Sequence, residues 1–419
     1  MLACSPPLPL IIDHDDKDHD LTAEDEKGII LALQHRDRVR RIQFGKPVLS
    51  VPSLHGIIKT MDGQFPMLEH LYILPPAMHD SHLVLPATFG APQLNHLSLN
   101  HFDPPIGSPF LTTAVSLVRL SLRRIRPSTN LYPNHLLQAL SLLPQLQIFM
   151  ISFSSPVPNR EIERHMLHLP NITHTTLPDL RSFCFVGVSA YLEALLSHLN
   201  TPLLEKLSVS FFNQLSFSIP RLRHFVTTTE NLRFHSVEFF FYHKAVVVFM
   251  YVSVGAPSST LDIHIGCDHL DWQVSSMAQI FNLLNPSSST VVDLSLDYRS
   301  HTLSSGSHNQ VDRTQWRKLL GSFRNVETLR VHHGLLGELS RCLALDGGPP
   351  SEILPELKIL VCPMGSRDDK TFATFVYDRE VAGRPVDLIE VAFPVGNTKY
   401  KFETLAGVEY VSSDPVPLP

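Results

Sequence analysis

The chain has few cysteines, few charged residues and no long aliphatic run. Its 5 cysteines are scattered over 419 residues with no close pair, which argues against a disulfide framework or a zinc motif and favours a reducing compartment. Charged residues make up 18%, below the usual quarter, and the net charge of −6 provides no general attraction to nucleic acid. The longest aliphatic run, Ala245–Ala256, is too short to span a membrane. We therefore expect a well-packed cytoplasmic or nuclear protein that binds neither nucleic acid nor membrane.

Catalytic and cofactor motifs are also missing. Gly187 and Ser189 do not form a nucleophile elbow, because Tyr191 stands where G-x-S-x-G requires its second glycine. No G-x-G-x-x-G, complete phosphate-binding loop or H-E-x-x-H occurs. The acidic run Asp13–Asp20 lacks the glycine and terminal glutamate of a calcium-binding loop, so a solvated turn is the favoured interpretation. The sequence predicts a protein that is not an enzyme and needs neither cofactor nor metal.

What the chain does have is a recurring phrase: a proline, an apolar residue two places later, and two more apolar residues three and five places after that. Six copies begin at Pro66, Pro92, Pro144, Pro178, Pro202 and Pro355. Five copies lack the proline and begin at Val39, Leu117, Val291, Val326 and Val386. With 33 prolines in 419 residues, about one such site in eleven would carry proline by chance, so the pattern indicates an internal repeat.

The spacing of the repeats identifies their class. Successive apolar starts lie 29, 26, 23, 29, 34 and 24 residues apart from Val39 to Leu204, and 35, 31 and 29 apart from Val291 onward. The interval between Leu204 and Val291 is 87 residues, so we expect two degenerate repeats there, starting at Leu232 and Leu261. In these two, His235 and His264 would occupy normally apolar places. Leucine-rich repeats have periods of 20–29 residues, so this chain is predicted to be an irregular member of that class.

One repeat cannot bury its own apolar side chains. Leu97 and Leu99 fall on one side of the expected strand, and His96, Ser98 and Asn100 on the other. Stacked neighbours supply the missing contacts. The recurring prolines are consistent with stacked strands, because proline ends a preceding element and is tolerated before a strand. The predicted fold is an α/β leucine-rich-repeat-like solenoid, with parallel strands on the concave face, helices on the convex face and irregular repeats of 23–35 residues.

Helix signals fall between the expected strands. We predict helices at Glu26–His35 after Thr22, His135–Leu143 after Asn134, Arg160–His168 after Asn159, Ala190–Leu199 after Ser189, Trp272–Leu284, Arg313–Phe323 after Asp312, Leu335–Leu345 and Lys370–Val381. Trp272 and Trp316 stand at helix starts among apolar residues, so both are expected to be core or staple residues.

The repeats show no linker that would separate two halves. We therefore expect one irregular solenoid over residues 1–400 and a C-terminal strand or tail over 401–419. Met1 stands almost inside the first expected strand, Leu8–Ile12, although solenoids normally have a polar terminal cap. Two expectations follow: either the first repeat is truncated and exposed, or a domain precedes it.

Seven short segments of the chain carry a resemblance to known proteins: Leu8–Asp13, Thr22–Ile30, Asp37–Ile42, Pro156–Arg160, Asn231–Phe234, His269–Trp272 and Asp312–Trp316. They resemble segments of the fungal, basidiomycete-type F-box-associated leucine-rich-repeat proteins. The resemblance covers essentially the whole chain and implies a repeat region that holds a substrate for ubiquitination, behind an F-box that docks a Skp-type adaptor. No F-box is found in this chain, so a Skp-type adaptor is expected only if an F-box exists upstream.

Side chains that point away from the core are the candidates for binding. Within the first four repeats they mix cations, an aromatic ring and hydrogen-bonding groups, a composition favoured at binding hot spots. We predict a protein-binding surface for an acidic or phosphorylated segment, formed by Arg41, Tyr72, His96, Arg119 and Arg123. The alternative is that these residues are only the solvated side of a sheet. The basic run at Arg36, Arg38, Arg40 and Arg41 could indicate phosphate or nucleic-acid contact, but interleaved Asp37, Val39 and Ile42 favour a strand entrance with mixed outward charges.

Two functions remain open from the sequence. The first is a non-catalytic protein-recognition scaffold like the substrate-binding repeat region of F-box-type ubiquitin-ligase receptors. The second is a stand-alone structural or regulatory repeat protein, or a truncated gene product, with no ubiquitin-ligase role.

Overall fold

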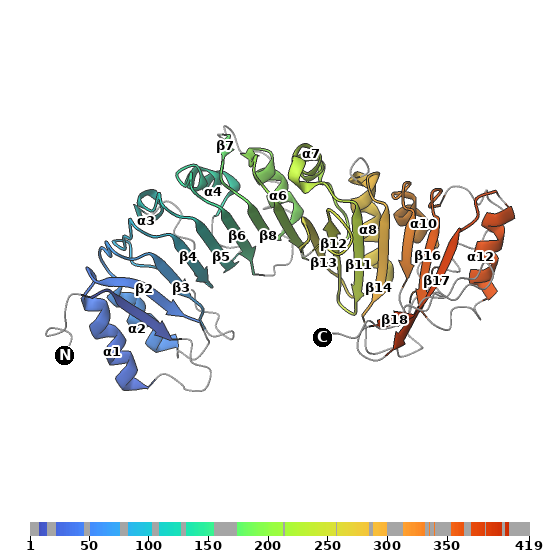
Figure 1. Cartoon of the computed structure of the whole chain (residues 1–419). Helices are drawn as coiled ribbons and strands as arrows, with labels where there is room; N and C mark the ends of the chain where they lie inside the picture. Colours follow the sequence, from blue (N-terminus) through green and yellow to red (C-terminus); the bar gives the residue numbers. More distant parts are fainter. Residues whose placement is uncertain are drawn as a thin grey trace, which may run out of the picture. The chain divides into compact units, whose positions relative to one another are not determined.

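A computed structural model shows a mixed α/β protein with a long, mainly parallel sheet (Figure 1). It describes residues 8–14, 22–45, 51–75, 83–102, 109–126, 131–154, 174–212, 214–256, 258–284, 288–299, 313–331, 335, 339, 353–363, 370–381, 383–395 and 399–401. The chain divides into two compact units, Met1–Ser208 and Val209–Pro419.

In the first unit the strands lie side by side in chain order, and successive strands from Leu10–His14 to Ser182–Gly187 pair in parallel. The strands are β1 (Leu10–His14), β2 (Val39–Phe44), β3 (His70–Ile73), β4 (His96–Asn100), β5 (Arg119–Ile125), β6 (Ile148–Phe153), β8 (Ser182–Gly187) and β10 (Lys206–Phe211), the last of which spans the division between the units. The helices are α1 (Ala23–Gln34), α2 (Val51–Thr60), α3 (Pro109–Thr113), α4 (Pro133–Leu140) and α6 (Ser189–Leu196). The short strands β7 (Thr175–Thr176) and β9 (Leu199–Asn200) form a separate pair.

The recurring proline has a specific place in each repeat. The N–H of the following leucine donates to the carbonyl three residues earlier, as from Leu68 to Phe65 at 3.2 Å and from Leu94 to Ala91 at 3.1 Å. Pro66 and Pro92 therefore occupy the second position of a tight turn, where a φ near −65° is required. The leucine that closes the turn is fully buried, and the strand begins two residues later. The same geometry recurs before β6, β8, β10 and β16 (Ile359–Pro363), which confirms the predicted repeat.

Inward side chains of the first unit form continuous rows across the strands. Leu71, Leu97, Leu120, Phe149 and Phe183 are successive cross-strand partners and all are buried. The rings of Phe149 and Phe183 stack with centroids 5.3 Å apart. Each strand therefore buries its apolar side chains against its neighbours, as stacking of repeats requires.

The second unit combines parallel strands with an antiparallel insertion. Its strand order is β13-β12-β11-β14-β15-β16-β17-β18. The strands are β11 (Ser236–Tyr242), β12 (Ala245–Tyr251), β13 (Leu261–Gly266), β14 (Asp293–Tyr298), β15 (Thr328–Val331), β16, β17 (Leu388–Val395) and β18 (Lys399–Lys401). The helices are α7 (Pro220–Thr228), α8 (Leu270–Leu283), α10 (Arg313–Gly321) and α12 (Lys370–Val381), and a short 3-10 turn covers Glu230–Leu232.

The two degenerate repeats predicted between Leu204 and Val291 are wrong. That interval contains an antiparallel meander, in which β12 pairs with both β11 and β13. Leu232 lies before β11, and Leu261 is itself the first inward residue of β13, followed by Ile263 and Ile265. His264 consequently points outward and does not occupy a core position.

Most of the predicted helices are present; α1, α4, α6 and α8 start one to three residues earlier than predicted, and α10 starts at Arg313 as predicted. Thr22 caps α1 as predicted, and its side chain and that of Asp25 form a reciprocal capping box. Asn134 and Ser189 do not cap their helices: α4 starts at Pro133 and α6 at Ser189 itself. Helix α12 has the predicted bounds, Lys370–Val381, whereas α2, α3 and α7 were not predicted. The helix predicted over 160–168, Asp312 and most of 335–345 lie outside the described residues.

The two tryptophans differ. Trp316 is fully buried and packs edge-on against Phe241, with ring centroids 5.6 Å apart, as predicted for a core residue. Trp272 is 44% exposed, so of the two roles predicted for it, core or staple residue, the core role is wrong. A single solenoid over residues 1–400 stays a prediction, and residues 402–419 of the expected tail lie outside the described part of the chain.

Candidate partner-binding surface

The five predicted binding residues lie on the outward side of four consecutive strands of the first unit. Arg41 is on β2, Tyr72 on β3, His96 on β4, and Arg119 and Arg123 on β5. Arg119 and Arg123 are exposed and the other three are half-buried, whereas the residues that alternate with them, such as Leu71 and Leu97, are buried. We call this side of β2–β5 the strand face.

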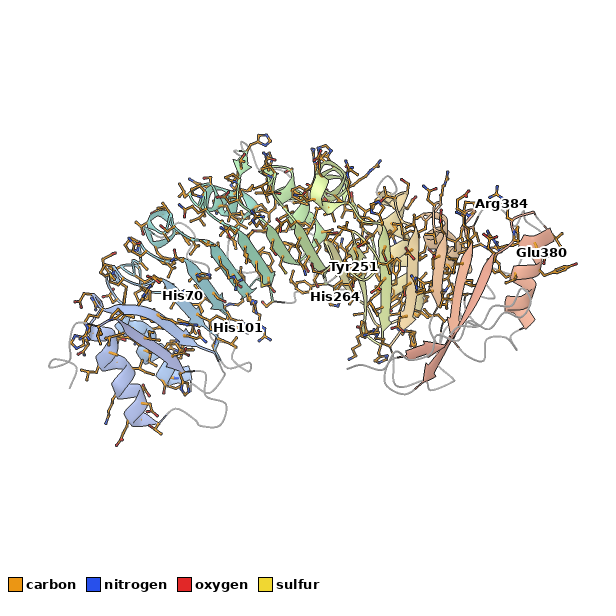
Figure 2. All side chains as sticks on the ribbon, in the orientation of Figure 1. His70, His101, Tyr251, His264, Glu380 and Arg384 are labelled. Carbon is orange, nitrogen blue, oxygen red and sulfur yellow. The ribbon has the colours of Figure 1, made fainter. Side chains whose placement is uncertain are left out.

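Four side chains of the strand face form one cross-strand row. Arg41 is the partner of His70, His70 of His96, and His96 of Arg119. Neighbouring strands lie about 4.8 Å apart, so this arginine–histidine row is continuous across the four strands. Tyr72 belongs to the next row, between Gln43 and Ser98. Figure 2 labels His70 on β3, within the arginine–histidine row.

The two histidines of the row stack on each other. The rings of His70 and His96 are 4.3 Å apart and nearly parallel, at 8°. Burial, followed by the charge of Arg41, lowers the pKa of His70, and Arg40 adds to this effect while Glu69 opposes it. Burial, followed by the charges of His70, Arg119 and Arg41, lowers the pKa of His96. The pair is therefore held neutral between two arginines to a lower pH than an exposed histidine would be.

Arg123 lies at an irregularity of β5. The register with β6 shifts between Leu122 and Ile125, and Arg124 has φ +53°. Such a bulge re-aims the side chains beside it. The Arg123 Nε donates to the Ser121 hydroxyl at 3.1 Å, and Arg124 contacts the His101 ring nitrogen at 3.0 Å. The bulge thus brings two arginines to the end of the strand face.

In the described part of the chain, three cations of the strand face have no carboxylate partner. Within the described residues, Arg41, Arg119 and Arg123 form no ion pair with a carboxylate. The neighbouring basic residues behave differently: Arg40 pairs with Glu69 at 2.9 Å, and Arg38 donates to the Leu8 carbonyl. The run at residues 36–41 is therefore a strand entrance with mixed outward charges, and only Arg41 contributes to the row.

Two nitrogen atoms of the row lack hydrogen-bond partners. Arg41 donates through Nη2 to Gln43 at 2.6 Å, but its Nε is shielded from solvent without a partner, as is Nδ1 of His96. A buried polar atom without a partner costs about 1–3 kcal/mol. A ligand that rearranges these side chains into hydrogen bonds with its own oxygen atoms can recover part of that cost.

Sequence reasoning did not select His70 as a site residue. It stands two places after the first apolar residue of its repeat, as do Arg41, His96 and Arg119, so the repeat register alone could have indicated it. The Arg124–His101 contact has no such signal, because it depends on the bulge in β5.

Two outward arginines of the second unit are arranged differently. Arg330 pairs with Asp293 at 3.0 Å, and Arg299 pairs with Asp297 at 2.7 Å. Within each pair the two opposite charges neutralise each other, whereas the described residues provide no such partner for Arg41, Arg119 and Arg123. Among the described residues, no group of three or more potential metal ligands and no helix long and apolar enough to cross a membrane is present.

The fold is leucine-rich-repeat-like: in the first unit, parallel strands recur with helices between most of them, and a buried residue closes the turn before β3, β4, β6, β8 and β10. No protein-family model matches the chain, and no curated protein is similar to it in sequence. Among solved structures, the chain is similar to the leucine-rich repeat-containing protein LegL7 from Legionella pneumophila. The two are 13% identical, the alignment covers 87% of this chain and 98% of that one, and the TM-score is 0.28.

Proposed function

We propose that this chain is a non-catalytic protein-recognition scaffold whose strand face binds an acidic or phosphorylated segment of a partner protein. The observation that carries the proposal is the arginine–histidine row, which joins Arg41, His70, His96 and Arg119 on adjacent strands. Arginine suits this role, because its planar fork matches carboxylate and phosphate oxygens. Tyr72 and Arg123 extend the surface on one side of the row, toward the C-terminal ends of the strands.

The resemblance to F-box-associated repeat proteins supports a finer version of this proposal. The partner would then be a ubiquitination substrate, held by the repeats of a cytoplasmic or nuclear receptor. Binding of a Skp-type adaptor would require an F-box upstream of this chain. The alternative is a stand-alone structural or regulatory repeat protein, or a truncated gene product, without a ubiquitin-ligase role.

Sequencing the transcript upstream of Met1 separates these versions. An in-frame F-box, together with co-purification of a Skp-type adaptor by the longer product, supports the receptor version. A genuine start codon at Met1 and no adaptor in pull-downs support the alternative. Neither result changes the prediction for the strand face itself.

Charge reversal tests the strand face. We expect Arg119→Glu together with Arg123→Glu to abolish capture of the principal partner in affinity purification with quantitative mass spectrometry, since an acidic segment would then meet two carboxylates. Both residues are exposed, so the fold should be unaffected. The matched control is Lys27→Glu with Lys59→Glu, which makes the same charge change on exposed positions of α1 and α2. Retention of every partner by the Arg119/Arg123 variant would refute the proposal.

A further inference from the structure

The outward side of the meander in the second unit carries aromatic rings and carboxylates. Phe239 and Phe241 point inward, where their rings pack against Phe281 of α8 and Trp316 of α10. The alternating residues, including Phe240 of β11 and Phe249 of β12, therefore lie on the opposite face and are half-buried. Figure 2 labels Tyr251 on β12 and His264 on β13, two other outward residues of the meander.

One aromatic ring of this face already holds an arginine. The Arg299 guanidinium carbon lies 4.3 Å from the centroid of the Phe240 ring, and Arg299 Nε pairs with the Asp297 carboxylate at 2.7 Å. Asp297 is the direct cross-strand partner of Phe240. An aromatic ring beside a carboxylate on the next strand thus binds a guanidinium through a cation–π contact and an ion pair together.

The same combination occurs a second time around Phe249. Its direct cross-strand partners are Glu238 on β11 and Asp262 on β13, so the ring has a carboxylate residue on each side. Side chains of directly opposed residues start about 5 Å apart, which places both carboxylates within reach of a guanidinium that lies over the ring. Within the described residues, no lysine or arginine forms an ion pair with Glu238.

The pKa of the neighbouring Tyr251 reflects the negative charges of Glu238 and Asp262. The Phe249 and Tyr251 rings lie 6.5 Å apart. Burial, followed by the charge and hydrogen bond of Glu238 and by the charge of Asp262, raises the pKa of Tyr251 to about 12. The residues Asp262, Phe249 and Glu238 therefore combine a π face with a potential that favours a cation, and no arginine of the described residues stacks on Phe249 as Arg299 does on Phe240.

We propose that Asp262, Phe249 and Glu238 form a binding site for an arginine side chain of a partner protein, equivalent to the site in which Phe240 and Asp297 hold Arg299. Arginine fits better than lysine, because a planar guanidinium stacks on the ring and presents donors to a carboxylate on either side. The site belongs to the second unit and its ligand has the opposite charge to that proposed for the strand face, so it stands independently of the proposed function.

The test uses the full chain and a fluorescein-labelled peptide in which arginines alternate with serines. The matched peptide carries citrulline, which keeps the shape and removes the charge. We expect the citrulline peptide to bind about tenfold more weakly in fluorescence anisotropy at physiological ionic strength. Phe249→Leu should weaken binding of the arginine peptide about fivefold, whereas Phe249→Tyr should stay within about twofold of the wild type.

Neutralisation of the carboxylates completes the design. Glu238→Gln with Asp262→Asn should weaken binding about tenfold, and Glu24→Gln with Glu26→Gln on α1, an equal change in net charge, should not. Far-UV circular dichroism checks that each variant is folded. If Phe249→Leu does not fold, Phe249→Tyr keeps the test decisive. The proposal is overturned by absence of binding to the wild type, by equal binding of the citrulline peptide, or by loss of affinity only on neutralisation and not in Phe249→Leu.

Discussion

At the scale of single residues, the stacked pair His70 and His96 couples the strand face to pH. Both pKa values are lowered in the folded chain, so below about pH 6.5 the unfolded chain binds more protons than the folded one. The contribution of the pair to stability is therefore present above that pH and declines as the pH falls. An anionic ligand has the opposite preference, because it binds better to imidazolium than to imidazole.

We therefore expect opposite pH trends for stability and for binding. Between pH 7.5 and 5.5 the melting temperature of the wild type should fall more than that of His70→Gln/His96→Gln, measured by circular dichroism. Over the same range, the affinity of the wild type for its acidic partner should rise, and the double variant should lose that gain. An equal fall in melting temperature for the two proteins would contradict the lowered pKa values of His70 and His96.

A second residue-scale prediction concerns Arg379 of α12, whose side chain is 1% exposed. Its guanidinium donates to the backbone carbonyls of Ile353, Leu354, Pro355 and Leu357 at 3.1–3.4 Å, around the turn that precedes β16. Burial, followed by the charge of Arg384, lowers the pKa of Arg379.

Arg379→Met should lower the free energy of unfolding by about 3 kcal/mol, because it leaves buried carbonyls without donors. Urea denaturation measures the change. Tyr377→Gln on the same helix is the control, since Tyr377 is 64% exposed and its replacement should change stability by less than about 0.5 kcal/mol. Equal midpoints for the two variants would show that Arg379 does not hold the turn.

At the scale of secondary-structure elements, the sequence predicts the strands best where the proline turn is present. Proline sets the turn, the leucine that closes it is buried, and the strand follows at a fixed distance. The meander was not predictable in this way. Its hairpin between β11 and β12 turns through His243 and Lys244, and neither is the glycine or asparagine that normally marks a two-residue loop.

Gln273 stabilises the meander from α8. Its side chain is 1% exposed, and Nε2 donates at 2.9 Å both to the Tyr242 carbonyl at the end of β11 and to the Cys267 carbonyl after β13. Gln273→Leu should lower the free energy of unfolding by about 2 kcal/mol, because two carbonyls lose their donor. Guanidinium denaturation of this variant beside Asn282→Ala, an exposed change on the same helix, checks the prediction. A cost no larger than that of the control would contradict it.

At the scale of the whole molecule, the repeat register explains both the core and the candidate site. Inward positions are uniformly apolar, so their identity could be predicted from the sequence alone. Outward positions are not constrained by packing, and therefore four basic or imidazole side chains in one register, Arg41, His70, His96 and Arg119, stand out against the uncharged side chains of the next row. The bulge in β5 and the antiparallel meander escaped prediction, because both depend on pairing between strands and not on the pattern within one.

The most direct test of this account asks which face of the repeats contacts a partner. A photo-reactive phenylalanine is placed at Tyr72, on the strand face, or at Leu31, which is 50% exposed on α1. After irradiation in cell extract, we expect the partner that is lost with Arg119→Glu/Arg123→Glu to cross-link to position 72 and not to position 31. Cross-linking of that partner to position 31 alone, or equally to both, would contradict recognition by the strand face.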